Sequence, residues 1–200
     1  MAIKFQYNQT YLQRLKKQLQ VRIKALPTLK NKEAALRSEV KKAREAAEKL
    51  DSTLEKQLQA YQHAIALWDE FDNELVSIDE VELSVKKIAG VKTPVLEDIR
   101  FGIKAYSMFN QPSWFLDGIG IVRQLATTAI EREVFYQKMQ LLDYARKKTT
   151  QKVNLYEKVQ IPGFEEAILK IKRYLEDEEN LSKAAQKIVK NRLQEMEEGV

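Results

Sequence analysis

The fold is decided by residues 12–54, which read LQRLKKQLQVRIKALPTLKNKEAALRSEVKKAREAAEKLDSTL. Apolar side chains recur there at alternating intervals of three and four residues, and the register continues to Trp68. Fourteen of the seventeen positions in this register are apolar, and the full set is Leu12, Leu15, Leu19, Arg22, Leu26, Leu29, Glu33, Leu36, Val40, Ala43, Ala47, Leu50, Leu54, Gln57, Tyr61, Ala64 and Trp68. A 3.5-residue repeat is typical of a helix that supercoils against a partner helix. The sequence therefore predicts one long N-terminal helix, starting near Asn8 or Thr10 and running to about Asp72, with an apolar seam.

A second seam lies near the C-terminus. It comprises Ile161, Phe164, Ile168, Ile171 and Leu175, and it continues after a slip in phase at residues 181–189. We expect a second long helix from about Trp114 to Glu195. A chain that runs out and back lets each seam find the other, so we expect an antiparallel two-helix coiled coil with both termini at one tip. Pro27 and Pro162 lie inside these helices and are expected to bend them, because proline lacks a backbone N–H.

The residues between the two helices follow a different pattern. Val81, Leu83 and Val85 alternate with polar residues at period two, which favours a β-strand. Residues 90–94 are turn-rich, and residues 95–106 favour a strand again. The sequence predicts a hairpin of residues 81–89 with 95–106. The expected fold class is mainly α, with an N-terminal coiled-coil helix (1–75), a central insert containing the hairpin (76–113) and a C-terminal coiled-coil helix (114–200).

Composition excludes several classes of protein. The chain has no cysteine, which excludes disulfides and thiolate chemistry and fits a reducing compartment. The first ten residues lack the apolar run of a signal peptide, and no stretch of eighteen apolar residues occurs. We therefore expect no direct membrane insertion, and the cytoplasmic location that we expect comes from the family resemblance described below.

Charge is distributed unevenly along the chain. Residues 1–60 hold 14 Lys/Arg and 6 Asp/Glu, whereas residues 61–120 hold 5 and 10, within a net charge of +5. A basic N-terminal part and an acidic middle indicate different partners along the molecule, and an ordinary solvated helix surface is the alternative.

The sequence contains no catalytic constellation and predicts no catalytic residue, cofactor or metal site. His63 is the sole histidine, and its place beside the seam favours a solvated side chain over a ligand. Four successive carboxylates at 176–179 point in different directions around a helix, which favours a solvated face or a basic partner over a metal ion.

Basic runs at 41–44 and 146–148 lack aromatic neighbours for base stacking, so no nucleic-acid partner is expected. Trp68, Trp114 and Phe115 are expected in the core, with a capping cluster or an exposed docking patch as the alternative for Trp114 and Phe115.

Three segments resemble a known family. Residues 147–162, KKTTQKVNLYEKVQIP, resemble the signature KKTxxxVNxxExxxIP of the D subunit of V-type (A/V-type) ATPases. Residues 29–36 resemble that family's LKxKRxxL segment, and Gly90–Pro94 resembles its central GVxxP. The order of the three matches is the family's order. Glu33-Ala34, Gly163 and Ala184-Ala185 depart from the family pattern, and these differences suggest a divergent bacterial branch.

The resemblance implies a non-catalytic subunit of a rotary ATPase. It implies a central rotor stalk whose paired terminal helices enter the hexamer of A and B subunits, with the F and C (d) subunits as further partners, at the membrane periphery. The matching positions, expected to be structural or at subunit interfaces, are Leu29, Lys30, Lys32, Gly90, Val91, Pro94, Lys148, Thr149, Val153, Asn154, Glu157, Ile161 and Pro162. From the residues alone, a free-standing coiled-coil scaffold or tether is the alternative.

Overall fold

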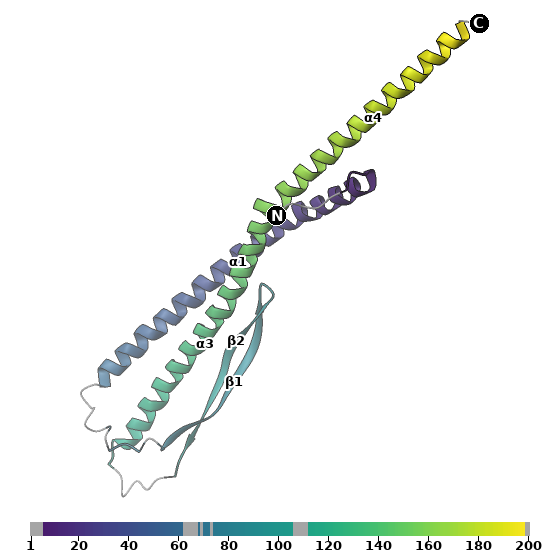
Figure 1. Cartoon of the computed structure of the whole chain (residues 1–200). Helices are drawn as coiled ribbons and strands as arrows, with labels where there is room; N and C mark the ends of the chain where they lie inside the picture. The colour runs from purple at the N-terminus through teal and green to yellow at the C-terminus, as the bar shows by residue number, and fades with distance from the viewer. Residues whose placement is uncertain (1–5, 62–67, 69, 73, 106–111, 199–200) are drawn as a thin grey trace. The chain divides into compact units, whose positions relative to one another are not determined.

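A computed structural model describes residues 6–61, 68, 70–72, 74–105 and 112–198. In chain order the elements are α1 (Gln9–Tyr61), β1 (Val76–Ile88), β2 (Val91–Ile103), α3 (Phe115–Leu155), the π-helical turn η2 (Tyr156–Gln160) and α4 (Ile161–Glu198) (Figure 1). The predicted fold class is confirmed, because two long helical segments flank a two-stranded antiparallel hairpin. The predicted continuation of the first helix passes through residues 62–67, which lie outside the described residues, as does His63. Its predicted end at about Asp72 is wrong, because residues 70–72 are not helical.

The chain forms two compact units, which we call the first unit (residues 1–31 and 149–200) and the second unit (residues 32–148). Helix α1 contributes to both units, since it runs from Gln9 to Tyr61 with Pro27 inside it. Each unit is described separately below.

In the first unit, α1 and α4 run antiparallel around one apolar core. Its buried members are Leu12, Leu15, Phe164, Ala167, Ile168 and Ile171, with Tyr11, Leu19 and Leu175 packed against them. The direction follows from pairs at successive levels, because Tyr7 lies against Tyr174 and Lys30 lies against Glu157. Asn8 caps the start of α1 as predicted, since its Oδ1 accepts a hydrogen bond of 2.7 Å from the backbone N–H of Tyr11.

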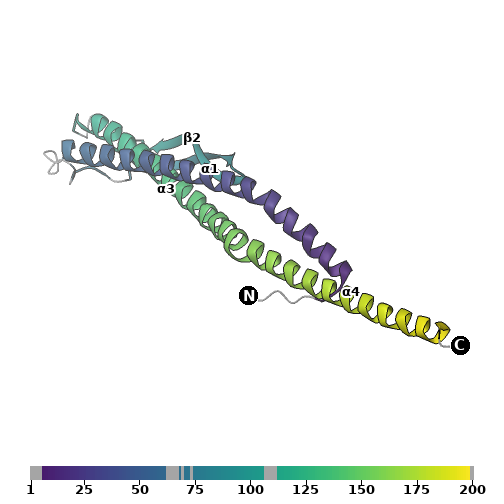
Figure 2. The ribbon, with the colours of Figure 1, turned by 90° about the horizontal axis from the view of Figure 1, so that it is seen from above.

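The expectation that both termini lie at one tip is wrong. The ring centroids of Tyr7 and Tyr174 are 4.7 Å apart, so α1 begins at the level of Tyr174. Helix α4 continues from there to Glu198, and Figure 2 shows it extending past the N-terminal end of α1. At about 1.5 Å per residue this extension is roughly 36 Å long. The first helix is simply too short to accompany the second one to its end.

In the second unit, residues of α1 and α3 lie together. Leu36 and Leu142 are fully buried, and the small residues Ala43 and Ala47 are buried beside them on the sequence seam. Arg132 of α3 forms an ion pair of 3.3 Å with Asp51 of α1. An aromatic cluster fills one end of this unit, formed by Trp68, Phe71, Trp114 and Phe115 with adjacent ring centroids 4.9–5.8 Å apart. The prediction that Trp68, Trp114 and Phe115 belong to the core is confirmed.

The hairpin is longer than predicted and turns at a different place. Its turn is only Ala89-Gly90, where both residues have positive φ (48° and 81°), as a two-residue type I′ turn requires. Residues 91–94 of the predicted turn region belong instead to β2, and Pro94 pairs with Val85. In a two-residue hairpin the pair next to the turn is hydrogen-bonded and the pairs then alternate, so Val85–Pro94 is a non-hydrogen-bonded pair. The missing N–H of Pro94 therefore costs the ladder nothing, which is why a strand accommodates this proline.

The hairpin lies along α3 in the second unit. Arg123 of α3 stacks on Phe101 of β2 at 5.2 Å. Further along, residues 94–97 of β2 and residues of α3 line a hollow of about 270 Å³, whose α3 residues are Glu131, Val134, Phe135 and Lys138. At the tip, a Cβ placed on Gly90 would lie 3.6 Å from Nζ of Lys32. The hairpin therefore does not sit only at the far end of the helices, as expected, but returns along α3 to the level of Lys32.

Among the described residues, no helix combines the length and the apolar character that a bilayer crossing requires.

Candidate functional site

The described residues contain no group of three or more metal-ligating side chains. The resemblance in the sequence directs attention instead to the segment 147–162 and the residues of α1 that face it. These residues are the candidate site, and their geometry is that of an interlocked helix pair.

The signature segment contains a π-helical turn at Tyr156–Gln160. The backbone N–H of Ile161 donates to the carbonyl oxygen of Tyr156, five residues back, instead of the usual four. Pro162 follows at once and has no N–H to donate to the preceding turn. The wide turn and the proline together loosen the hydrogen-bond ladder at one level. Pro162 was expected to disturb the helix, whereas the sequence pattern did not predict the π-turn.

Arg22 of α1 fastens this turn to α1. Its Nε donates to Oε1 of Gln160 at 2.7 Å, and its guanidinium lies over the ring of Phe164 at 4.5 Å and near that of Tyr156 at 6.0 Å. A second bond runs from its Nη1 to the carbonyl oxygen of Gln18 at 3.0 Å. A planar guanidinium satisfies the amide and the aromatic ring simultaneously, which an ammonium would not do as well.

Lys30 of α1 and Glu157 of the π-turn form a second link between the two helices, which with the Arg22 contacts we call the two clamps. The Lys30 Nζ donates to Oε1 of Glu157 at 2.7 Å, with both side chains about half exposed. Both residues belong to the family-signature set, from segments 127 positions apart. An exposed ion pair of this kind contributes about 0–1 kcal/mol, so it sets the register more than it supplies stability.

The other signature residues fall into three groups. Thr149 and Val153 are buried, while Leu29 and Ile161 are half-buried at the helix contact. Asn154 and Pro162 are exposed. In the second unit, Lys148 lies over the ring of Tyr144 at 4.4 Å.

The hairpin signature residues are brought next to Lys32, at the tip described above. Gly90 occupies the left-handed turn position, and Val91 and Pro94 are half-buried in β2. The structure thus brings residues 29–36 of the resemblance next to the hairpin tip through Lys32, and it joins the same segment to residues 147–162 through Lys30 and Glu157.

The seam residues also divide between the units. Leu12, Leu15, Leu19, Phe164, Ile168, Ile171 and Leu175 share the core of the first unit. In the second unit Leu36 is fully buried, whereas Val40, Leu50 and Leu54 are half-buried.

Two carboxylates have lowered pKa values near the helix contacts. The hydrogen bond from Lys42 lowers the pKa of Glu39, and the charges of Lys138 and Lys86 act in the same direction. Hydrogen bonds from Arg146 and Lys147 lower the pKa of Asp143. Both carboxylates therefore hold their charge in ion-pair networks.

The last part of α4 has no covering element among the described residues. Every described side chain from Glu176 to Met196 is exposed. We call this segment the α4 tail. It carries a stripe of large apolar residues whose exposed fractions are 55–73%, namely Leu181, Ile188, Val189, Leu193 and Met196. Such a stripe marks an interaction surface, because isolated soluble helices rarely leave one uncovered.

Besides the π-turn, sequence reasoning missed two parts of this site, namely the bonds of Arg22 and the uncovered state of the α4 tail. The signal for the first was present, because Arg22 is a polar residue in an otherwise apolar seam. The second had no signal, since residues 181–189 read as an ordinary continuation of the seam.

Comparison with known proteins identifies the family. The sequence model for the ATP synthase D subunit matches residues 11–191. The chain belongs to the ATP synthase D subunit family. The V-type ATP synthase D subunit of Chlamydia muridarum (strain MoPn / Nigg) is 31% identical over 180 residues, covering 86% of this chain and 88% of the relative. That of Chlamydia trachomatis serovar L2 (strain ATCC VR-902B / DSM 19102 / 434/Bu) is 30% identical over 178 residues with the same coverage, and that of Chlamydia abortus (strain DSM 27085 / S26/3) is 29% identical. The family resemblance that the sequence motifs indicated is confirmed.

Membership in this family makes the chain a component of an ATP synthase complex. The described helices of this D-subunit family member therefore act within a larger assembly, and surfaces left uncovered in the single chain are candidates for contacts with other subunits.

Proposed function

We propose that the chain is the central rotor stalk of a V-type ATPase/ATP synthase and transmits torque between the catalytic A/B hexamer and the ion-translocating ring. The observation that carries the proposal is the α1–α4 pair with its uncovered α4 tail. A single helix twists and bends easily, whereas two helices locked by interdigitating side chains resist both deformations. The core of the first unit and the clamps at Arg22 and Lys30 provide such a lock.

The partners follow from the same role. We propose that the α4 tail enters the A/B hexamer, where its apolar stripe meets the surrounding subunits. The F and C (d) subunits are proposed to bind the remaining surface, with the hairpin as one contact for F or for the base of the hexamer. The chain acts at the membrane periphery on the cytoplasmic side, inserts no segment into the bilayer and catalyses no reaction itself.

We further propose that Pro27, Pro162 and the π-turn build curvature into the stalk. An axle that is asymmetric about its axis favours a different conformation in each of three catalytic sites, which a straight symmetric axle would not do.

The decisive experiment is reconstitution. Purified A and B subunits are combined with F and either the parent chain or a chain in which Leu181, Ile188 and Leu193 are changed to Ser. The parent is expected to support rotation-coupled ATP hydrolysis, whereas the triple variant is expected to bind the hexamer at least tenfold more weakly. Full activity with the triple variant would contradict the proposal, and circular dichroism checks that the variant keeps its helix content.

The alternative, a free-standing scaffold or tether, predicts a different set of companions. A rotor stalk co-purifies with A, B and F, whereas a tether brings down other proteins. A nucleic-acid binder would carry absorbance at 260 nm.

A further inference from the structure

The tip of the hairpin concentrates positive charge, although the charge of Lys86 also acts on Glu39 of α1. Lys86, Lys87 and Lys92 flank the two-residue turn, and Nζ of Lys32 lies next to Gly90 of that turn. Among the described residues, none of these four lysines has a carboxylate oxygen within 4 Å.

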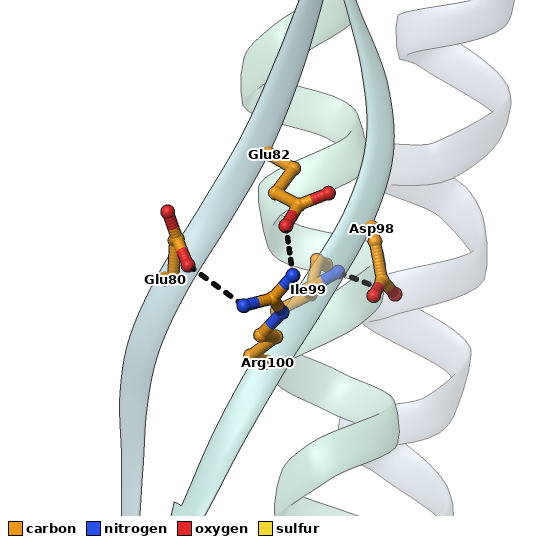
Figure 3. Close-up of polar contacts among 5 residues, drawn as sticks. All are labelled: Glu80, Glu82, Asp98, Ile99 and Arg100. Carbon is orange, nitrogen blue, oxygen red and sulfur yellow. Dashed lines mark hydrogen bonds and ion pairs between the residues drawn. The ribbon is translucent and has the colours of Figure 1, made fainter.

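Several other basic groups of the second unit form ion pairs within the chain. Lys41, Lys42 and Arg44 each form an ion pair with a glutamate of α1 itself. In the basal half of the hairpin, Arg100 bridges Glu80 and Glu82 across the strands (Figure 3). Among the described residues, the hairpin therefore has ion pairs in its basal half, whereas the lysines at its tip form none.

The strand register places two of the tip lysines directly opposite each other. Lys87 pairs with Lys92, one step from the hydrogen-bonded pair that flanks the turn. It is therefore a non-hydrogen-bonded pair, in which the two side chains stand closest together. Like charges in that position destabilise a hairpin. The chain keeps an arrangement that costs stability, which is expected where a partner supplies the opposite charge.

The same face of the hairpin also carries apolar side chains. Val85 and Leu83 follow Lys87 at intervals of two residues, and they are 66% and 49% exposed. The other face is the covered one at this level, since Thr93 is fully buried and its Oγ1 donates to the carbonyl oxygen of Lys86 at 2.9 Å.

We propose that this face, formed by Lys87, Lys92, Val85 and Leu83, docks an acidic polypeptide segment that also carries an apolar side chain, with Lys32 beside the turn as a third positive charge. The three lysines complement carboxylates, and Val85 with Leu83 complements the apolar residue. A polypeptide fits better than a nucleic acid, because no aromatic ring lies among these residues to stack on a base. The inference deepens the proposed function and rests on it, since the acidic segment is expected in another subunit of the same assembly.

The test uses the assembly purified through an N-terminal tag on the full chain. A carbodiimide joins a lysine amine to a carboxylate only when the two are in contact, and mass spectrometry then identifies the linked peptides. We expect Lys87 or Lys92 to be linked to an Asp or Glu of another polypeptide. Links confined to this chain's own carboxylates would overturn the inference. The identities of the co-purifying polypeptides test the proposed function separately.

Substitutions provide the second arm. The double variant K87Q/K92Q removes the like-charge pair, so its unfolding midpoint is expected to equal or exceed that of the parent, while retention of the linked partner falls about tenfold. The matched control K49Q/K56Q removes two exposed lysines of α1 and is expected to retain the partner as the parent does. Partner retention unchanged in K87Q/K92Q would contradict the inference. A loss of binding to a labelled 20-nucleotide single strand, with partner retention unchanged, would replace the polypeptide by a nucleic acid.

Discussion

The two halves of α4 have similar patterns and different surroundings. From Ile161 to Leu175 the apolar stripe is buried against α1, and Ile171 is fully buried. From Glu176 onward the stripe continues, yet Ile188 is 55% exposed. The comparison teaches that an apolar period in a helix predicts a partner without saying whether that partner belongs to the same chain. In this D-subunit family member, the first half packs within the chain, whereas the second half is uncovered and is the surface that we propose for the assembly.

The largest expected effect is a difference in the free energy of unfolding between the same substitution made in each half of α4. Ile171→Ala removes a fully buried side chain and is expected to lower the free energy of unfolding by about 2–5 kcal/mol. Ile188→Ala, the same substitution in the α4 tail, is expected to change it by no more than about 0.5 kcal/mol. Urea titration followed by circular dichroism measures both. Equal losses in the two variants would mean that the tail is packed in the isolated chain and would remove the contrast.

Removing the tail tests the other side of the comparison. A chain ending at Glu179 loses no residue of the core in the first unit, so its unfolding midpoint is expected to stay within a few degrees of the parent's. Its affinity for the A/B hexamer is expected to fall at least tenfold, which corresponds to about 1.4 kcal/mol. Analytical ultracentrifugation of the mixture reports the binding. A truncated chain that assembles normally would show that the tail is only a solvated extension.

Arg22 allows the packed half to be probed without creating a cavity in the apolar core. Arg22→Ala breaks the bond to Gln160 and the stacking on Phe164, and it is expected to cost about 1–3 kcal/mol. The exposed neighbour Lys24→Ala serves as the matched control, with an expected change of no more than about 0.5 kcal/mol. Thermal unfolding of both variants provides the comparison. If the two variants unfolded alike, Arg22 would not hold the π-turn against α1.

The smallest expected effect concerns two exposed ion pairs, one in each half of α4, whose carboxyl groups are expected to titrate alike. Glu166 bonds to Lys170 in the packed half, and Glu179 bonds to Lys183 in the tail; these bonds lower the pKa of both carboxyl groups. A carboxyl group with a lowered pKa in the folded state adds stability that is present above its unfolded pKa. That stability disappears as pH falls through the lowered value. Carboxyl ¹³C shifts followed between pH 7 and pH 2 are expected to give a midpoint below the ordinary glutamate value at both positions. A normal midpoint at Glu179 alone would show that the tail helix frays in solution.

Much of this architecture is readable from local patterns. The seventeen-position register in the N-terminal part predicted a long helix, and period-two alternation predicted a hairpin in the middle. The motif KKTTQKVNLYEKVQIP indicated the family because it combines rare residues in a fixed order. These features depend on neighbouring residues, so the amino-acid order specifies them directly.

The hairpin boundaries show where local patterns stop being sufficient. Residues 90–94 contain Gly and Pro and were assigned to a turn, although Val91–Pro94 pairs with Val85–Ile88 in the strands. The proline is accepted because the register turns its missing N–H away from the partner strand. The register depends on all the residue pairs between β1 and β2 together, and a short stretch of sequence includes only a few of these residues.

Helix periodicity, the central hairpin and the family motif are properties of residues close together in the chain, and they are written plainly in the amino-acid order. Three features arise only when distant residues meet in the folded chain. Arg22 finds Gln160 and Phe164, the hairpin tip reaches Lys32, and α1 begins at the level of Tyr174 so that the rest of α4 lies uncovered. The reason is physical, because the free energy of a contact depends on which surface is brought opposite, and periodicity describes one surface at a time.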